Sequence, residues 1–437
     1  MFTHANSLLV LSTILLTSTS VAEDWTRFRG PNGNGIGKSA APTSWDAENN
    51  LKWSIDLPGP GSSCPIVLND RVYLTCYTGY GIDQRNPGNV HELKRHVLCF
   101  DRKTGKEIWR ASVNSENDED PYKGFITHHG YASSTPVTDG EHIFVHFGKT
   151  GVFAFDMDGN QVWKKHIGSK SDPAKWGNGA SCVLYNDLVI INAGNTDNAI
   201  IAFNKKNGEE AWRVKDPKFT FTWSTPIIVT VEDHDEMIIN MPGKILGYDP
   251  STGKELWWAT SPIDRTVCGS CVYDNGIAYA MGGREGRAIA VRVGGKGNVT
   301  ESHTVWSTNL RSGINTPIIA NGNLYWIASD KIYCADCKTG QYEYTERLKA
   351  SGPRSQGPSG DYASPIAIGD KLVLLTRTGT THVVKAADEF EKIGENRFDG
   401  DNSRFNATPA ISDGEMFIRS NKKLYCIAKT KKKVAAK

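Results

Sequence analysis

The sequence lacks a surplus of charge of either sign. Its 437 residues carry 50 Lys and Arg against 48 Asp and Glu, a formal net charge of +2. Proteins that bind nucleic acid or an anionic membrane surface usually carry a clear basic excess. We therefore expect neither as a partner, and we interpret residues 431–437 as a solvated basic tail.

The sequence also has little that could enter a membrane. The apolar run Leu8–Leu16 is shorter than the roughly 20 residues that a spanning helix needs. It precedes Ser20-Val21-Ala22, a pattern typical of a secretory signal, although no Lys or Arg comes before it. We expect residues 1–22 to be a signal peptide and the mature chain to be periplasmic or extracellular. The first cysteine is Cys64, so we expect no lipid anchor after the signal.

Signatures of catalysis are missing as well. The chain has no adjacent cysteine pair, no G-x-S-x-G elbow, no Ser-His-Asp order and no G-x-G-x-x-G between a strand and a helix. Residues 33–39 superficially resemble a phosphate loop, but Asn32 stands where its first Gly belongs and no strand precedes it. We therefore predict no catalytic residue and no nucleotide site.

What the sequence does have is a short motif that recurs. An Asp or Asn leads to a Gly, and an aromatic residue stands four positions after that Gly. Gly closes a tight hairpin because it tolerates positive φ, the Asp or Asn bonds turn amides, and the aromatic can seal a contact with a neighbouring unit. A fixed unit of this size indicates a repeat architecture. The five copies end at Trp109, Trp163, Trp212, Trp257 and Tyr344.

A second signature opens each unit: a small residue, often followed by Pro, as in Ser63-Cys64-Pro65. Pro is admissible at the first residue of a strand. Eight such openings lie near residues 63, 134, 180, 224, 270, 315, 363 and 407, and each unit offers four strands, A to D. The last unit ends without a fourth strand, whereas the strand around Trp53 stands alone. We predict that this strand completes the last unit and closes a ring.

The pattern Ala-x-Asp-x-x-Thr-Gly-x-x-x-Trp resembles the tryptophan-docking repeat of quinoprotein dehydrogenases. It is also similar to the repeat of the lipoprotein subunit of the outer-membrane β-barrel assembly machinery. The resemblance covers nearly all of residues 51–430 and implies an all-β, eight-bladed β-propeller of four-stranded antiparallel blades, after an irregular extension at residues 23–50. The docking residues it implies are Trp53, Trp109, Trp163, Trp212, Trp257 and Trp306.

In such a blade the strands run from the axis outward, so the D–A and B–C loops share one face. The residues before each opening should then surround the mouth of a channel, where they suit a flat or anionic polar ligand. The alternative is a channel that holds only water. The predicted ring is Ser62, His129, Tyr131, Trp176, Asn178, Trp223, Arg265, Arg311, Asn315, Asp361, Tyr362, Arg404 and Asn406.

Two long insertions, residues 77–95 and 114–130, fall on the same face. The second contains an acidic run followed by two histidines, which together could hold a metal ion. The competing interpretation, which we favour, is a solvated loop with satisfied histidines. The residues concerned are Glu116, Asp118, Glu119, Asp120, His128 and His129.

The nine cysteines are an odd number for a disulfide framework. Two Cys-x-x-Cys pairs, Cys268/Cys271 and Cys334/Cys337, have the ligand number of a zinc site, but the repeat puts them on opposite faces. Cys334 also occupies the slot that Ala154 fills, which is a packing position. We predict no metal site, and a local disulfide at Cys268/Cys271 stays open.

The function remains open between three interpretations. The first is an exported, non-catalytic scaffold that binds a protein or a small polar ligand through the face of the D–A loops, acting as a monomer. The second is an oxidoreductase dependent on pyrroloquinoline quinone (PQQ), or a degenerate relative. The resemblance implies adjacent cysteines and a calcium site for that class, and this chain lacks the cysteine pair. The third is a carbohydrate- or metabolite-binding domain.

Overall fold

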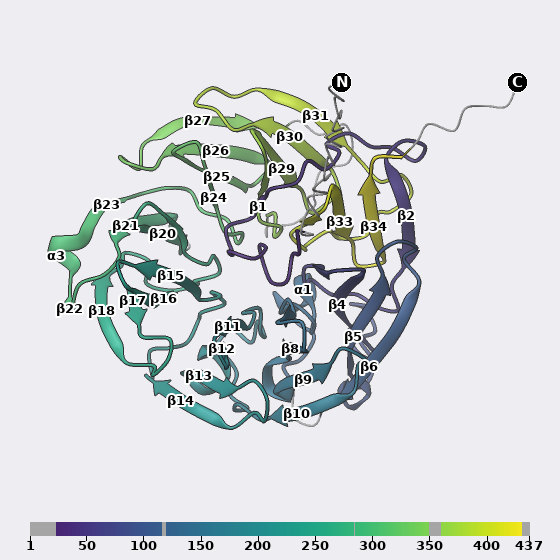
Figure 1. The fold of residues 1–437 in the computed structure, drawn as a ribbon, viewed down its shortest axis with the longest axis horizontal. Helices are drawn as coiled ribbons and strands as arrows, with labels where there is room; N and C mark the ends of the chain where they lie inside the picture. The colour runs from purple at the N-terminus through teal and green to yellow at the C-terminus, as the bar shows by residue number, and fades with distance from the viewer. Residues whose placement is uncertain (1–22, 116–118, 284, 349–359, 431–437) are drawn as a thin grey trace, which may run out of the picture.

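Eight sheets stand around a central axis like the blades of a propeller (Figure 1). The structure is a computed structural model and describes residues 23–115, 119–283, 285–348 and 360–430. The predicted signal peptide and the basic tail lie outside the described residues. The prediction of an all-β, eight-bladed propeller is confirmed, and its blades are numbered here in chain order.

The first four blades follow one another along the chain. Their strands are, for blade 1, β3 (Ile66–Leu68), β4 (Arg71–Thr78), β5 (Lys94–Asp101) and β6 (Glu107–Asn114); for blade 2, β7 (Val137–Thr138), β8 (His142–His146), β9 (Val152–Asp156) and β10 (Gln161–Lys165); for blade 3, β11 (Val183–Tyr185), β12 (Leu188–Ala193), β13 (Ala199–Asn204) and β14 (Glu210–Lys215); and for blade 4, β15 (Ile227–Val231), β16 (His234–Met241), β17 (Lys244–Tyr248) and β18 (Glu255–Thr260).

The remaining blades continue the order, and the last takes its outer strand from the N-terminal part of the chain. Their strands are, for blade 5, β19 (Val272–Asp274), β20 (Ile277–Gly282), β21 (Arg287–Arg292) and β23 (Thr304–Thr308); for blade 6, β24 (Ile318–Ala320), β25 (Asn323–Ala328), β26 (Lys331–Asp336) and β27 (Tyr342–Arg347); for blade 7, β28 (Ile366–Ile368), β29 (Lys371–Leu375), β30 (Thr381–Lys385) and β31 (Lys392–Asn396); and for blade 8, β32 (Ala410–Ser412), β33 (Glu415–Arg419), β34 (Lys423–Ala428) and β2 (Leu51–Asp56).

The few helices are short and lie in the connections. They are η1 (Val90–Glu92), α1 (Ile126–His129), η2 (Gly148–Thr150), α2 (Gly194–Asp197) and α3 (Thr300–His303). The predicted closure is confirmed, because β2 pairs antiparallel with β34 and Trp53 lies opposite Cys426. Strand β2 therefore completes the fourth position of blade 8 and covers the edge of β34.

The repeated tryptophans dock each blade onto the next. The indole N–H of Trp109 donates to the carbonyl of Met157 in the C–D turn of blade 2, and a Cβ on Gly159 of that turn would lie 2.8 Å from its ring. The turn therefore needs Gly both for its positive φ and for contact with the indole. The same N–H bond to the next turn is made by Trp53, Trp163, Trp212 and Trp306.

The docking tryptophans are not all alike. Trp53, Trp109 and Trp306 are only half-buried, because the outermost strands face solvent. Trp257 is fully buried, but its N–H donates to the carboxylate of Glu236 in its own blade. The reason is that blade 5 has no Thr-Gly turn on which Trp257 could dock.

A small residue stands opposite each docking aromatic on the neighbouring strand. The partners across the ladder are Ala154 for Trp163 and Cys99 for Trp109, for example, and the register shifts by one residue next to each pair. A bulge at this point bends the outer strand, and a small side chain leaves space for the ring. The cysteines in this slot are thus packing residues, as predicted.

Two blades contain a fifth, two-residue strand, which the sequence interpretation did not anticipate. In blade 5 the long connection that replaces the Thr-Gly turn forms β22 (Gly297–Asn298), which pairs parallel to β18 at the outer edge of blade 4. At the axis, β1 (Ile36–Gly37) pairs parallel to β28 of blade 7. Both extra strands cover an edge that would otherwise have unpaired backbone groups.

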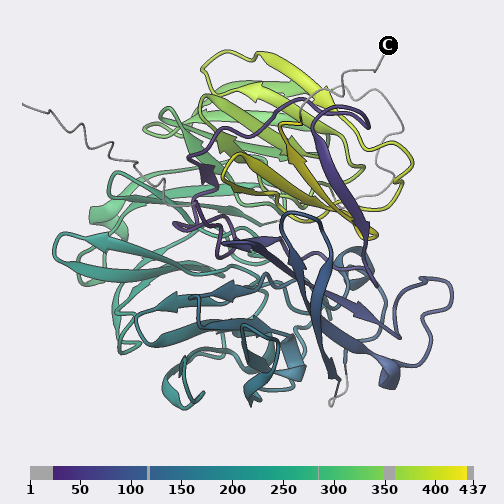
Figure 2. The ribbon, with the colours of Figure 1, turned by 45° about the vertical axis from the view of Figure 1, so that its right-hand side comes forward.

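The extension at residues 23–37 closes one end of the central channel. It starts beside the A–B turns of blades 8 and 1, where Asp24 accepts a bond from the Asn69 backbone, and it lies in the middle of the ring (Figures 1 and 2). Trp25 forms a bridge to Val67 of β3. The fully buried guanidinium of Arg29 donates to the carbonyl of Thr316 in blade 6. The segment therefore plugs the channel from the face of the C–D turns.

Candidate functional site

A belt of hydroxyl groups surrounds the axis where the A strands begin. The backbone N–H of one opening residue donates to the side-chain oxygen of the next, as from Thr135 to Ser181 at 3.0 Å and from Ser181 to Thr225 at 3.0 Å. Seven such bonds run from Cys64 around to Thr408. The hydroxyl side chain in seven of the opening signatures is therefore explained, since it links one blade to the next.

Above this belt lies a cavity of about 510 Å³, within the range of about 300–1,000 Å³ that is usual for ligand pockets. Phe28 of the plug forms part of its wall, as do belt residues and residues of the D–A loops. Because the plug enters from the opposite face, we infer that the cavity opens on the face of the D–A loops.

The structure divides the predicted ring into two groups. Those that line the cavity are Ser62, His129, Trp176, Trp223, Asn315, Asp361, Tyr362 and Asn406. Those that do not are Tyr131, Asn178, Arg265, Arg311 and Arg404. Eight of the residues that precede a blade opening therefore do meet at the cavity. Whether a given side chain points into it depends on the conformation of its loop.

The second group has other surroundings. Tyr131 is buried in a cluster with Tyr77, Tyr80 and Tyr122. Its hydroxyl donates to the carbonyl of Asp120, so it holds the backbone of the second insertion in place.

Asn178 lies beneath the rim and donates to the hydroxyl of Ser134 at 2.6 Å. The side chains of Arg265 and Arg311 are exposed on the loops before blades 5 and 6. Both arginines therefore stand at the outer rim, outside the cavity wall.

One wall of the cavity is aromatic. The rings of Trp176 and Trp223 are stacked with centroids 5.1 Å apart, and Phe125 lies 4.4 Å from Trp176. Trp223 is 9% exposed and its indole N–H donates to the carbonyl of Gly177. The three rings come from three different connections, so the wall exists only when the loops are folded together.

The opposite wall, from the openings of blades 6, 7 and 8, is polar. It contains Asn315, Asp361 and Asn406, each at most 6% exposed. Desolvation by burial raises the pKa of Asp361 to about 6, against the lowering effect of the backbone N–H of Arg377, which donates to its carboxylate. The carboxyl is thus largely ionised at neutral pH and becomes protonated in mild acid.

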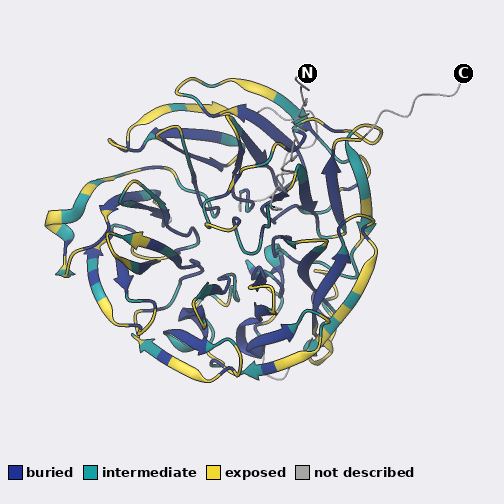
Figure 3. Ribbon diagram, in the orientation of Figure 1, coloured by how far each residue is buried: buried dark blue, intermediate teal, exposed yellow. Residues whose placement is uncertain are grey.

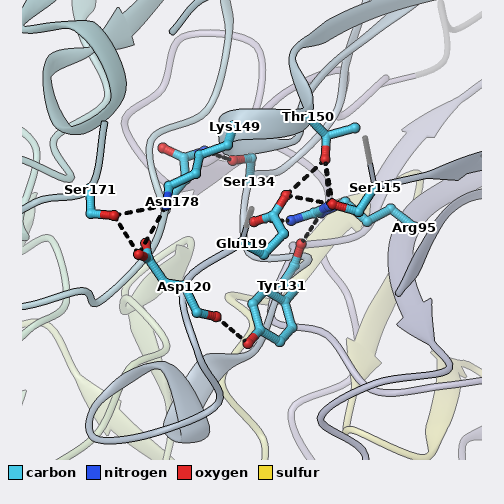
Figure 4. Close-up of polar contacts among 10 residues, drawn as sticks. All are labelled: Arg95, Ser115, Glu119, Asp120, Tyr131, Ser134, Lys149, Thr150, Ser171 and Asn178. Carbon is cyan, nitrogen blue, oxygen red and sulfur yellow. Dashed lines mark hydrogen bonds and ion pairs between the residues drawn. The ribbon is translucent and has the colours of Figure 1, made fainter. Parts of the chain in front are cut away.

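The base of the second insertion is fixed by buried ion pairs (Figure 4). Glu119 pairs with Arg95 of β5 at 2.9 Å, and Asp120 pairs with Lys149 of η2 at 3.0 Å. Although burial opposes it, Arg95 holds the pKa of Glu119 below its usual value. The favoured interpretation of this acidic run as a solvated loop is wrong at these two positions, because each acid meets a buried base. Glu116 and Asp118 lie outside the described residues.

The tip of the insertion reaches across the mouth to blades 7 and 8. At the end of helix α1, the carbonyl of His128 accepts hydrogen bonds from the side chains of Arg377 and Asn406. The carbonyl of Thr127 accepts one from Arg404. Cationic groups favour the carbonyl end of a helix. The insertion is therefore held at both ends and narrows the entrance to the cavity.

The histidines and the thiols at the cavity are uncharged at neutral pH. Burial lowers the pKa values of His128 and His129 to about 4, and His129 is bonded through both ring nitrogens, to Ser133 and to the Trp176 carbonyl. Burial raises the pKa of Cys268 to about 12 and that of Cys64 above its usual value. Within the described part of the chain all nine cysteines are free, so the two Cys-x-x-Cys pairs are reduced thiols here.

The residues present do not match the PQQ and calcium of the second interpretation. Calcium takes six to eight oxygen ligands, typically with several carboxylates, whereas Asp361 is the only acidic residue lining the cavity in the part of the chain that the structure describes. In the described ranges no group of three or more His, Cys, Asp or Glu side chains is arranged to hold a metal. We therefore derive no chemistry through these groups.

Sequence reasoning missed some residues of the site. Phe125 and Phe28 line the cavity although neither stands before a blade opening. Phe125 was inside a long insertion and Phe28 inside a segment without a periodic pattern, so neither had a signal of its own. The belt hydroxyls were visible as the opening signature, and only the ring geometry makes them part of a cavity.

Comparison with known proteins agrees with this architecture. The family model for outer membrane protein assembly factor BamB matches residues 93–345, more than half of the chain. An outer membrane protein assembly factor BamB of Burkholderia pseudomallei is 24% identical over 206 residues, which is 47% of this chain and 43% of that protein. The chain therefore aligns with less than half of that relative's length.

Solved structures share the fold at low sequence identity. BamB from Moraxella catarrhalis has a TM-score of 0.60 at 13% identity, covering 86% of this chain and 96% of its own. A europium-containing methanol dehydrogenase has a TM-score of 0.66 at 10% identity, covering 93% and 98%. In the part of the chain that the structure describes, no helix is long and apolar enough to cross a membrane. The chain is a PQQ-like β-propeller and belongs to the family described as outer membrane protein assembly factor BamB.

Proposed function

We propose that the protein is an exported, non-catalytic scaffold that binds a protein partner through the face of the D–A loops and the two insertions. The observation that carries the proposal is the difference between the two faces. One face has long connections fixed by the Glu119–Arg95 and Asp120–Lys149 pairs. The other has mostly tight turns such as that at Gly105. Binding sites collect on elaborated loops that a rigid scaffold holds in place.

A protein is the partner class that the family supports. The named relatives are outer membrane protein assembly factors, and we extend that role to this chain as a proposal. Arg265 and Arg311 at the exposed rim suit carboxylates of a partner, and the half-buried Trp176 suits an apolar or aromatic group. Tyr131 and Asn178 would act by holding the loops in place rather than by touching the partner.

The state of the cavity groups supports binding rather than catalysis. Nucleophilic cysteines need a lowered pKa, whereas burial raises the pKa values of Cys64 and Cys268. His129 has both ring nitrogens occupied by Ser133 and the Trp176 carbonyl. A side chain bonded in this way positions a loop and is not free to move a proton.

Export is part of the same proposal. If the signal is removed after Ala22, Glu23 becomes the first residue and its α-amino group carries a positive charge. The Glu23 nitrogen lies 2.7 Å from a carboxylate oxygen of Asp413, so the new terminus would gain an ion pair. N-terminal sequencing of the mature protein should then begin near Glu23, and retention of residues 1–22 would contradict export by this route.

Photo-crosslinking in the cells that make the protein tests the binding face. A photoreactive phenylalanine analogue replaces Arg265 or Arg311 on the proposed face, or Thr104 or Thr252 in the exposed turns of the opposite face. We expect a discrete protein adduct from the first two positions and none from the control positions. Adducts confined to Thr104 and Thr252 would place the partner on the wrong face and overturn the proposal.

A double variant distinguishes contact from proximity. Trp223 is buried and bonded to Gly177, so its replacement would disturb the loops themselves. Trp176→Ala with Arg311→Ala is the better choice, since neither side chain is fully buried. This variant should lose the adduct formed at Arg265 while keeping its melting temperature. Trp258→Ala with Arg213→Ala, on the outer strands, is the matched control and should keep the adduct.

A further inference from the structure

We propose that the cavity inside the ring binds a neutral, polyhydroxylated ligand such as a sugar ring, between the wall of Trp176, Trp223 and Phe125 and the wall of Asn315 and Asn406. This site goes beyond the proposed protein-binding face, since it lies within the ring rather than on its rim. Three features of the cavity lead to this ligand class: acceptors without donors, hydroxyl groups without acceptors, and stacked aromatic rings.

The first feature is a pair of buried amide oxygens. The Asn315 amide nitrogen donates to the carbonyls of Ile327 at 2.7 Å and Asp361 at 3.1 Å. Since carbonyls only accept, this pattern fixes the orientation of the amide group. The Oδ1 atom of Asn315 then has no hydrogen-bond partner among the described residues, although the residue is only 6% exposed and lines the cavity.

Asn406 repeats this arrangement two blades further on. Its amide nitrogen donates to the carbonyl of His128 at 2.7 Å and to the Ser62 hydroxyl at 3.1 Å. Its Oδ1 atom likewise has no partner among the described residues, and the residue is 6% exposed. A buried acceptor left unpaired costs about 1–3 kcal/mol. Both oxygens are enclosed in this structure, so a ligand with O–H or N–H donors would pair with them only after a small rearrangement of this wall.

The second feature is the hydroxyl belt. In the described part of the chain, five belt hydroxyls accept a backbone N–H and are not seen to donate to any protein atom. A hydroxyl can donate and accept at the same time. The cavity therefore offers donors as well as acceptors, which matches alcohol groups better than an ammonium ion, because ammonium can only donate. The five residues are Ser181, Thr225, Ser270, Thr316 and Ser364.

The third feature is the aromatic wall. The faces of the Trp176 and Phe125 rings carry the negative side of the π quadrupole. The C–H groups on one face of a sugar ring are weakly positive and pack against such a surface, while its hydroxyl groups at the edge remain free to bond. A cavity with aromatic rings on one side and polar groups on the other fits this distribution.

The charges around the cavity favour a neutral ligand. Among the described residues, Asp361 is the only acidic one in the wall, and no Lys or Arg lines it. Arg377 lies close by, with its backbone N–H on the Asp361 carboxylate and its guanidinium 4.8 Å from the Tyr362 ring centre. The positive charge of Arg377 partly offsets that of the Asp361 carboxylate, and an ionic ligand would add an unbalanced charge to a desolvated site.

Isothermal titration of the full mature chain tests the proposal. The probes are glucose, galactose, N-acetylglucosamine and maltose, with choline as a cation and citrate as an anion. We expect one or more of the sugars to bind with one site per chain and to change the tryptophan fluorescence, while choline and citrate do not bind. No binding by any of the four sugars at a Kd tighter than roughly 10 mM would overturn the proposal, and so would preferred binding of choline or citrate.

Two variants from different walls locate the site. Trp176→Ala and Asn406→Ala should each weaken sugar binding by about tenfold or more, whereas Trp258→Ala on β18 should leave it unchanged. Equal binding by all three variants would place the sugar elsewhere and overturn the proposal. Circular dichroism and thermal melting exclude a variant that has not folded. The crosslinks at Arg265 and Arg311 test a different contact, so either hypothesis can fail without the other.

Discussion

The indole N–H of Trp53 donates to the backbone carbonyl of Arg102 at a distance of 3.0 Å, and this bond joins the last blade to the first. Arg102 also contacts blade 8 through its side chain. Its guanidinium donates to the Glu415 carboxylate at 2.7 Å and to the Ser412 carbonyl at 2.7 Å. Contacts between blade 8 and blade 1 close the ring, so their loss should lower the stability of the whole propeller. The first prediction therefore concerns this junction.

Deletion of residues 51–57 should lower the free energy of unfolding by several kcal/mol. The deletion removes β2 and the Trp53 contact, and the loss of one large aromatic side chain already costs about 3–5 kcal/mol in a well-packed site. Urea unfolding followed by circular dichroism measures the change. Removal of residues 431–437 is the control for shortening the chain. A deletion variant that unfolds at the same urea concentration as the parent would contradict closure by β2.

Trp257→Ala should destabilise the protein more than Trp109→Ala. Trp257 is fully buried and its N–H satisfies the carboxylate of Glu236, so the variant creates a cavity and leaves a buried acceptor. We expect about 3–5 kcal/mol for Trp257→Ala and less than about 3 kcal/mol for the half-buried Trp109. Denaturant titration of both variants gives the comparison. The reverse order would mean that docking between blades outweighs packing within blade 4.

Arg102→Ala should cost roughly 3–5 kcal/mol, because it leaves the nearly buried carboxylate of Glu415 with one partner fewer. The matched control is Arg110→Ala. Arg110 forms a more exposed pair with Glu107 three residues away, and exposed pairs contribute about 0–1 kcal/mol. Equal losses for the two variants, measured by chemical unfolding, would show that Arg102 does not carry the closing interface.

The stability of the protein should fall as the pH drops from about 6.5 to about 4. Burial lowers the pKa of His382 to about 4, and similar shifts affect His96, His128, His129 and His146. Within this window these imidazoles are protonated in the unfolded chain but neutral in the folded chain, so the unfolded state binds more protons and gains stability.

His382 tests this mechanism because it is fully buried in β30. Asp361 acts in the opposite direction, since its pKa is raised and its burial favours the folded state in acid. Melting curves between pH 4 and 7 should show a shallower loss for His382→Met than for the parent protein. The same slope in both proteins would mean that His382 does not titrate differently on folding.

Glu119→Ala should loosen the second insertion and leave the blades folded. The variant removes the partner of the buried Arg95 and breaks the bond to the Thr150 hydroxyl. Hydrogen exchange of residues 120–131 should speed up, while that of the inner strands should stay slow. Glu107→Ala, on the exposed face of β6, is the control. Unchanged exchange in the insertion would mean that α1 is held by Arg377 and Arg404 alone.

Much of the fold could be predicted from local patterns. The turn at Gly105 and the aromatic at Trp109 repeat because each unit makes the same short-range hairpin and the same contact with its neighbour. The unpaired strand at Trp53 and the incomplete last unit could be matched by counting. Such features depend on residues a few positions apart, so the sequence alone is enough to predict them.

The site was less predictable, because it is made of side chains from connections far apart in the chain. Asn315 and Arg311 lie on one loop, yet the first faces the cavity and the second points to the rim. Glu119 and Asp120 read as a solvated acidic run, and only the fold brings Arg95 and Lys149 against them. Loop direction and charge pairing at long range leave no periodic signal.

By itself, the sequence determined the number of blades, their order and the closure of the ring, because hairpin turns and docking aromatics are local and repeat. Only the tertiary structure decided that residues 23–37 plug one end of the channel and that α1 narrows the other. Arg29 reaches the Thr316 carbonyl and Arg404 reaches that of Thr127. Those contacts join segments hundreds of residues apart. They can form, and stabilise the fold, only once the ring has brought the segments together.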